Sequence, residues 1–211
     1  IMLGEAETVV AGGMENLSQS PHVLRDERTT YKLGRSPRKG EEIPRDMEDY
    51  FFTNLRDDVC GYFMAQTSDE LCKMLDVSRE DADSFAALSH QRTENSIRNG
   101  IWEDEIVEVI TPEGVLDSSH DDHVVLGTTI ESLSGLRTHF GPDSLVTAGN
   151  ASGVVDGAAA IVVKSGARAK SDGDAPLSRI VSWGIVGLDP KIMAHGPVPS
   201  SNLALQKAGL K

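Results

Sequence analysis

The chain has 211 residues, 39% of them hydrophobic and 25% charged, an ordinary composition for a globular protein that buries a sizeable core. Its formal net charge of −13 argues against nucleic acid and anionic membranes as general partners, because both require positively charged surface. No apolar run approaches the ~20 residues that span a bilayer, and no secretory signal is visible, so we expect a cytoplasmic protein. The acidity fits a salt-adapted cytoplasm and an ordinary acidic cytosolic protein equally well.

The first element predicted along the chain is a short, buried strand over 8–11, which Gly12 and Gly13 end in a tight turn. A polar, irregular stretch follows from about 18 to 50, where Pro, Gly and both signs of charge are mixed. Near its end, a short helix is expected over 47–54.

Helix starts are indicated where a hydroxyl residue precedes an acidic residue by three positions, the pattern of a capping box. The pairs are Thr67 with Glu70, Ser78 with Asp81, and Thr128 with Glu131. The second helix carries small and apolar residues at helical spacing and is expected to stop at Gly100. The third is short and carries Leu133 and Leu136.

The remaining predicted elements alternate between strand and helix. They are a half-exposed strand over 106–110, a buried strand over 158–163, a short helix over 165–170, a second buried strand over 177–183 and a last helix over 201–208. Pro112 and Gly114 turn the chain after the first of these strands. This alternation indicates an α/β fold.

Residues 147–163 read TAGNASGVVDGAAAIVV, a run of small residues that leads into an apolar strand. Gly, Ala and Ser fill a core poorly, but they let another group come close to the main chain, whose N–H and C=O groups then become its partners. Ser152 adds a hydroxyl. The stretch therefore suits the close approach of a flat or linear ligand, or of another strand.

Side chains that could act as nucleophiles or metal ligands are sparse. Cys60 and Cys72 lack the CxxC spacing of a zinc site, and we interpret both as reduced core thiols. The run HDDH at 120–123 is interpreted as a solvated acidic turn, because neighbours on an extended segment point to opposite faces and do not converge on a metal. No nucleotide-binding or nucleophile-elbow motif occurs.

Four longer segments carry a more specific signal. They read VVAGGMENLSQSPH at 9–22, VSREDADSFAALSHQR at 77–92, VTAGNASGVVDGAAA at 146–160 and GLDPKIMAHGPVPS at 187–200. In this order and at this spacing they resemble the thiolase family, the acyl-CoA acyltransferases. The resemblance covers nearly the whole chain and does not depend on any one motif.

The resemblance implies a partial thiolase-like α/β fold, with the end of the first βα half, an inserted loop domain and the start of the second half. The implied boundaries are 1–26 for the first half, 27–156 for a loop domain that binds coenzyme A (CoA), 157–175 for the return to the first half and 176–211 for the second half.

The activity implied by the resemblance is acyl-CoA C-acyltransferase, a Claisen-type cleavage or condensation of 3-ketoacyl-CoA through a Cys acyl-enzyme. The family's catalytic Cys and His segments match no part of this chain, and neither Cys60 nor Cys72 occupies a catalytic position. We therefore expect an internal fragment that has no catalytic residue and is inactive alone. Neither a metal nor a redox cofactor is implied, because CoA and acyl-CoA are substrates.

The resemblance assigns residues to a CoA channel, in which small side chains leave room for the slim pantetheine arm. The CoA-binding residues are Leu55, Ser132, Leu133, Phe140, Ala148, Ala151, Ser152 and Gly153, and the acyl-pocket residues are Phe63, Met64 and Met193. Two positions depart from the family's pattern: Phe63 stands where some members have a His, and Val125 stands where an Arg often meets the nucleotide. An apolar residue cannot make that charge-assisted contact, so we expect weaker nucleotide binding unless Arg137 or another residue substitutes.

Two hypotheses of function stay open. In the first, the chain is the middle of a thiolase and works in a homo-oligomer or with complementary thiolase segments. In the second, it is a non-catalytic CoA-binding or assembly subunit of a split thiolase. A condensing enzyme that acts on acyl carrier protein is a weaker third, because its docking face is usually basic and the net charge here is −13. The isolated chain is expected to fold poorly or to depend on partners, because its strands have unpaired edges.

Overall fold

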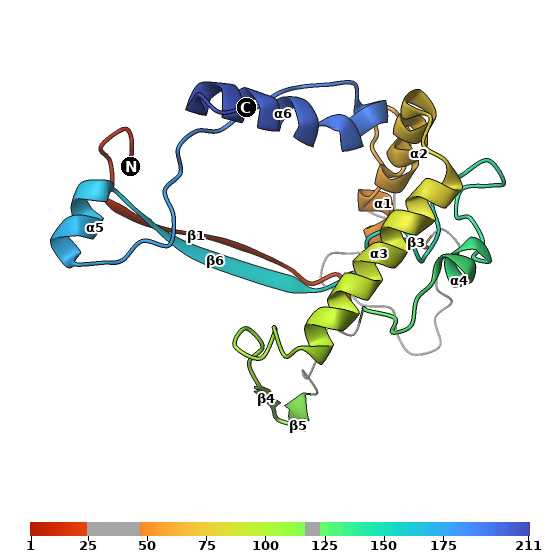
Figure 1. Cartoon of the computed structure of the whole chain (residues 1–211), viewed down its shortest axis with the longest axis horizontal. Helices are drawn as coiled ribbons and strands as arrows, with labels where there is room; N and C mark the ends of the chain where they lie inside the picture. Colours follow the sequence, from red (N-terminus) through yellow and green to blue (C-terminus); the bar gives the residue numbers. More distant parts are fainter. Residues whose placement is uncertain (25–46, 117–122) are drawn as a thin grey trace. The chain divides into compact units, whose positions relative to one another are not determined.

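The computed structural model describes residues 1–24, 47–116 and 123–211 (Figure 1). Its contacts divide the chain into two compact units, which we describe separately. The strand unit comprises Ile1–Gly61, Val154–Leu188 and His195–Lys211, and the helical unit comprises Tyr62–Gly153 and Asp189–Ala194.

Two long antiparallel strands form the centre of the strand unit. They are β1 (Thr8–Glu15) and β6 (Gly157–Lys164), which lie side by side in Figure 1 and pair from Thr8 opposite Lys164 to Glu15 opposite Gly157. The predicted stop at Gly12 and Gly13 is wrong, because both glycines lie inside β1. A Cβ on Gly12 would lie 2.7 Å from the carbonyl oxygen of Ala159, so glycine lets the two backbones approach.

The prediction that these strands are buried is also wrong for the described chain. Every residue of β1 is exposed, and so are the first six of β6. Apolar composition indicates what a strand can bury, but burial requires a second layer against its face. The described residues place no such layer on this strand pair. Residues 177–183 form no strand either, because no described segment pairs with their main chain.

Shorter elements complete the strand unit. They are β2 (His22–Leu24), β3 (Met47–Asp49), α1 (Tyr50–Asn54), α5 (Gly166–Asp172) and α6 (Pro197–Ala208). The helix predicted over 47–54 starts only at Tyr50, because the three residues before it pair with β2. The last helix starts at Pro197, four residues earlier than predicted, since proline fits the first turn of a helix.

The helical unit contains three helices and a hairpin among its described residues. They are α2 (Met64–Leu75), α3 (Arg79–Arg98), α4 (Ile130–Ser134), β4 (Val109–Thr111) and β5 (Gly114–Leu116), and most of the 3-10 segment η1 (Pro190–His195) also belongs to this unit. The strand predicted over 106–110 is thus shorter and shifted toward the turn. None of the helices in the described ranges is both long enough and apolar enough to cross a membrane.

The predicted helix starts differ in accuracy. In α3, Ser78 accepts the Asp81 N–H at 3.1 Å, and Gly100 follows the helix with φ +65°, so this helix is confirmed at both ends. By contrast, α2 begins before Thr67, whose hydroxyl donates to the carbonyl oxygen of Met64 at 2.6 Å. The cap of α4 is Thr129, one residue later than predicted.

Candidate functional site

Residues 144–153, which we call the small-residue turn, carry half of the predicted CoA-binding residues. The root of the turn is buried, and Thr147 is 0% exposed. Ala148 and Ser152 are exposed, and Ala151 and Gly153 are half-buried. The turn therefore presents a small-residue edge on a buried base.

Hydrogen bonds inside the turn fix its shape. The Thr147 N–H donates to the side-chain oxygen of Asn150 at 2.8 Å, and the Ala151 N–H donates to the Thr147 carbonyl at 3.1 Å. The Gly149 N–H donates to the Thr147 hydroxyl at 3.3 Å. Since these groups satisfy one another, the turn has a defined conformation despite its small residues.

Buried carboxylates from two helices hold the turn from outside. Asp69 of α2 accepts the Leu145 N–H at 2.9 Å. Asp83 of α3, which is 1% exposed, accepts from the side-chain amide of Asn150 at 3.0 Å. The same amide donates to the Leu145 carbonyl at 2.9 Å.

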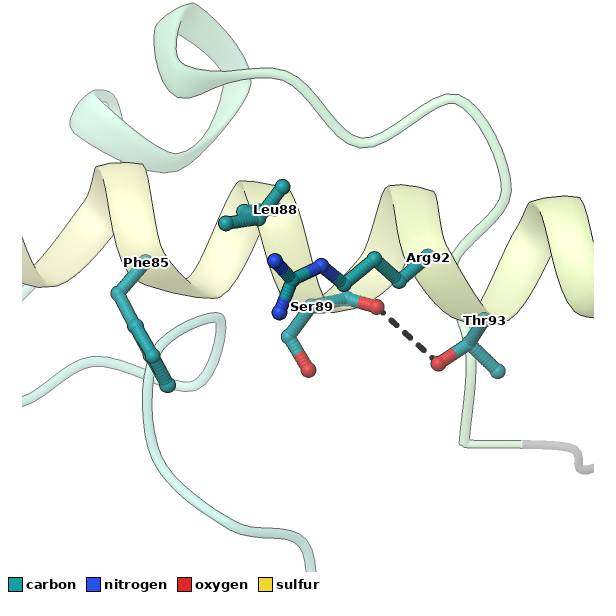
Figure 2. Close-up of a pocket in the computed structure, with 5 residues that line it drawn as sticks. All are labelled: Phe85, Leu88, Ser89, Arg92 and Thr93. Atoms are coloured by element: carbon teal, nitrogen blue, oxygen red, sulfur yellow. Dashed lines mark hydrogen bonds between the residues drawn. The ribbon is translucent and has the colours of Figure 1, made fainter.

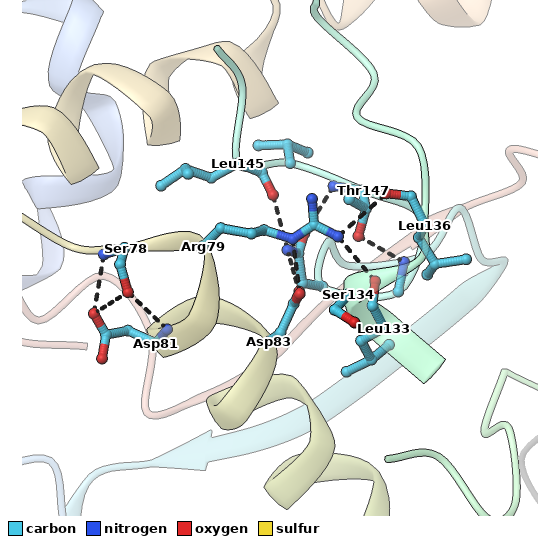
Figure 3. Close-up of polar contacts among 12 residues, drawn as sticks. Ser78, Arg79, Asp81, Asp83, Leu133, Ser134, Leu136, Leu145 and Thr147 are labelled. Carbon is cyan, nitrogen blue, oxygen red and sulfur yellow. Dashed lines mark hydrogen bonds and ion pairs between the residues drawn. The ribbon is translucent and has the colours of Figure 1, made fainter. Parts of the chain in front are cut away.

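Arg79 connects this arrangement to α4 (Figure 3). Its Nε donates to Asp83 at 2.7 Å, and its terminal nitrogen donates to the carbonyls of Leu133 and Leu136 at 2.8 Å and 3.2 Å. The guanidinium thus compensates the buried charge of Asp83 and covers carbonyl groups at the end of α4.

At two glycines of the turn, other side chains of the same unit occupy the space that a Cβ would need. A Cβ on Gly149 would meet the methyl groups of Leu133 and of Leu136, the latter at 2.5 Å. A Cβ on Gly153 would overlap the imidazole ring of His123. The small side chains at these positions therefore admit neighbours from the same unit, and Ala148 and Ser152 form the part of the edge that faces outward.

Other predicted CoA-binding residues have varied surroundings. Leu133 is 4% exposed and packs against Gly149, so it offers a ligand little surface. Ser132 is exposed, and its hydroxyl donates to the Thr129 carbonyl at 2.8 Å. Leu55 is half-buried and follows α1 in the strand unit.

The structure brings two predicted aromatic residues together. The rings of Phe63 and Phe140 stack with their centroids 5.9 Å apart. Met64, the first residue of α2, has an exposed side chain next to this pair in sequence. Lys191 lies with its Nζ 5.9 Å from the ring centre of Tyr62, which places the segment that carries the exposed Met193 against the start of α2.

The two cysteines are half-buried and unpaired, in keeping with reduced thiols. Burial, with a smaller effect of the Asp69 charge, raises the pKa of Cys72. Because the thiolate is the nucleophile, Cys72 is poorly suited to covalent catalysis. Within the described ranges no three His, Cys, Asp or Glu side chains could hold a metal ion, and residues 120–122 of the predicted acidic turn lie outside those ranges.

A hollow of about 140 Å³ lies on one face of α3, lined by Phe85, Leu88, Ser89, Arg92 and Thr93 (Figure 2). Small-molecule pockets usually measure about 300–1,000 Å³ and draw on several elements. The hollow is too small for that role and is separate from the predicted site residues.

Sequence reasoning missed Arg79, Asp83 and Asn150. The sequence did indicate an ion pair, because Arg79 and Asp83 stand at i, i+4 spacing in α3. Asp83 also precedes the buried Ala87 by one turn, which places a charged residue on the stripe that faces inward. A carboxylate at such a position requires a partner from elsewhere in the fold.

Comparison with known proteins gives one consistent result. Residues 1–167 match the family described as thiolase, N-terminal domain. The acetyl-CoA acetyltransferase of Shinella zoogloeoides is 38% identical over 213 residues, which cover 100% of this chain and 52% of that protein. The acetyl-CoA acetyltransferase of Cupriavidus necator is 40% identical over 211 residues, 99% of this chain and 52% of that protein.

Among solved structures, human mitochondrial 3-ketoacyl-CoA thiolase in complex with CoA aligns with a TM-score of 0.85 and 37% identity. The alignment covers 99% of this chain and 50% of that one. The chain thus has a partial thiolase fold and spans about half the length of the relatives that it matches.

Proposed function

Because this chain belongs to the thiolase family, we propose that it is the CoA-binding part of an acyl-CoA C-acyltransferase. The reaction is a Claisen-type thiolytic cleavage or condensation of 3-ketoacyl-CoA. Its Cys acyl-enzyme forms on residues outside this chain. The chain itself binds and orients the substrate.

The observation that carries the proposal is the exposed edge of the small-residue turn. Ala148 and Ser152 are exposed although Thr147, the residue directly before Ala148, is completely buried at the base. A linear pantetheine arm fits against such an edge, where side chains do not obstruct it and where the Ser152 hydroxyl can hydrogen-bond to an amide. The solved relative in complex with CoA, which aligns with 99% of this chain, supports CoA as the ligand.

The aromatic and sulfur-containing residues of the helical unit suit the remainder of the ligand. The stacked pair Phe63 and Phe140 offers a flat apolar surface, and Met64 and Met193 are adaptable side chains suited to an acyl group. Val125 is exposed and uncharged, so we expect no charge-assisted contact with the nucleotide at that position.

Titration of the full chain with CoA in a calorimeter tests the binding function. Ser152→Trp, which fills the proposed pantetheine path, is expected to weaken binding at least about 100-fold, while Ser152→Ala keeps the path open and changes affinity by less than about fivefold. Equal affinity of wild type and Ser152→Trp would overturn the assignment of the channel.

Activity assays test the assignment of catalysis. The full chain alone is expected to show no thiolysis of acetoacetyl-CoA, because the family's catalytic Cys and His segments match no part of it. Burial also raises the pKa of Cys72, which disfavours its thiolate. Turnover that disappears on Cys60→Ala or Cys72→Ala would contradict the placement of the nucleophile outside the chain.

A further inference from the structure

We propose that Asp83 is a positioning residue for CoA, which acts through Asn150 to hold the small-residue turn in the form that presents Ala148 and Ser152. This inference rests on the proposed function. It assigns a role to Asp83, a buried residue of α3 that is not among the predicted site residues.

The contacts of Asp83 account for both of its oxygens. One accepts from Arg79 at 2.7 Å and the other from the Asn150 amide at 3.0 Å. With 1% exposure, the carboxylate cannot exchange these partners for water. Its bond to Asn150 joins residues 67 positions apart.

Asn150 transmits this constraint to the edge of the turn. Its oxygen accepts the Thr147 N–H, and its amide reaches both Asp83 and the Leu145 carbonyl. These bonds place Asn150 between the exposed Ala148 and Ser152. A change in its side chain therefore moves the residues proposed to contact pantetheine, and a displacement of about 1 Å is enough to impair binding or catalysis.

The second carboxylate, Asp69, acts at the other end of the turn. It accepts the Leu145 N–H, before the proposed CoA edge begins. Asp83 is the carboxylate that reaches the edge itself. This difference separates positioning from a general contribution to stability, which both residues make.

The experiment compares four variants of the full chain by CoA titration, thermal unfolding and amide hydrogen exchange. Asp83→Leu removes both bonds of the carboxylate, Asp83→Asn keeps one oxygen acceptor for the Asn150 amide, and Asn150→Ala removes the receiving side chain. Ala87→Gly is the matched control, because it weakens α3 one turn further along and leaves in place every hydrogen-bonding group that holds the turn.

Asp83→Leu and Asn150→Ala are each expected to weaken CoA binding about tenfold and to speed exchange of the Thr147 and Ala151 amides. Asp83→Asn is expected to stay within about threefold of wild type. Ala87→Gly lowers the melting temperature but leaves the affinity within about twofold. Should Asp83→Leu fail to fold, Asn150→Ala and Asp83→Asn still provide the comparison.

Three results would overturn the inference, and they are distinguishable. If wild type binds CoA and Asn150→Ala binds it within twofold of wild type, Asp83 has only a structural role and the proposed function stands. If wild type binds no CoA, the proposed function fails and the inference fails with it. If Ala87→Gly lost as much CoA affinity as Asn150→Ala, lower stability and not lost positioning would explain the weaker binding.

Discussion

In the strand unit, valines face the solvent, whereas in the helical unit a carboxylate and threonines are buried. Val10 of β1 is 72% exposed and Val162 of β6 is 64% exposed, while Asp83 and Thr147 are 1% and 0% exposed. The strand pair is held by its main-chain ladder, and the turn is held by side-chain hydrogen bonds to two helices. Burial thus follows from available partners more than from residue type.

This comparison predicts that single substitutions have larger effects in the turn than in the strand pair. The two tryptophans allow each unit to be followed separately, because Trp102 lies in the helical unit and Trp183 in the strand unit. A Trp183→Phe background isolates the fluorescence of Trp102, and the reverse change isolates that of Trp183.

The largest effect is expected for Asp83→Leu. Removal of the carboxylate leaves Arg79 and the Asn150 amide without their buried partner, which costs about 3 kcal/mol of unfolding free energy. Urea unfolding followed by Trp102 measures this loss. Asp172→Leu in α5, a helix of the strand unit, is the control and is followed by Trp183. Its partners Lys164 and Arg168 are accessible to water, so the loss is expected to be much smaller. Similar losses in the two variants would contradict the comparison.

Gly149→Ala is expected to destabilise the helical unit by about 2 kcal/mol, because its methyl group meets the side chains of Leu133 and Leu136. Leu133 is buried and cannot swing away freely. Gly135→Ala in the same unit places its methyl 3.9 Å from the Ser132 carbonyl, an ordinary contact, and is expected to be nearly neutral. A neutral Gly149→Ala in urea unfolding would show that the leucines can repack.

Neighbouring glycines test the strand pair. Gly12→Ala forces a methyl against the Ala159 carbonyl and is expected to cost about 1 kcal/mol, because backbone must shift. Gly13→Ala meets nothing within 4 Å and is expected to be neutral or slightly stabilising. Hydrogen exchange of amides in β1 and β6 measures both. Faster exchange in Gly13→Ala than in Gly12→Ala would refute the close approach at Gly12.

The smallest effect concerns pH and the cap of α3. The Ser78 hydroxyl, followed by the Ser78 N–H, donates to Asp81 and holds its pKa below the ordinary value. A lowered folded-state pKa stabilises the fold above the unfolded pKa of about 3.9, and this contribution is lost as the pH falls through the folded value. Wild type should therefore be more stable than Asp81→Asn at pH 7, and the difference should shrink in acid. If the difference in unfolding free energy between the two proteins, measured through Trp102 fluorescence, stayed constant down to pH 2, the link between the Asp81 pKa and stability would be excluded.

Local signals explain the successful sequence predictions. The Ser78 cap and Gly100 fix the ends of α3 through bonds within a few residues, so they were readable in the chain itself. The four family segments likewise led to the thiolase family, which the comparisons confirm. Thr67 misled the prediction of α2, because the same hydroxyl pattern also occurs inside a helix, where it bonds to a preceding carbonyl.

Contacts between distant residues account for what the sequence could not show. Gly12 was taken for a turn, but its partner Ala159 lies in another strand of the chain. From the sequence, the small residues of this stretch were interpreted as room for a ligand or for another strand, and Gly153 was assigned to the CoA channel. The structure packs Gly149 against Leu133 of α4 and against Leu136 just after it, and leaves the outward edge to Ala148 and Ser152.

By itself, the sequence determined the family, the α/β character and the ends of α3, since each depends on patterns within short segments. Only the tertiary structure decided that Asp83, Asn150 and Leu145 meet, and that β1 pairs with β6. Hydrogen bonds act over about 3 Å, and residues far apart in sequence come within that distance only when the whole chain has folded.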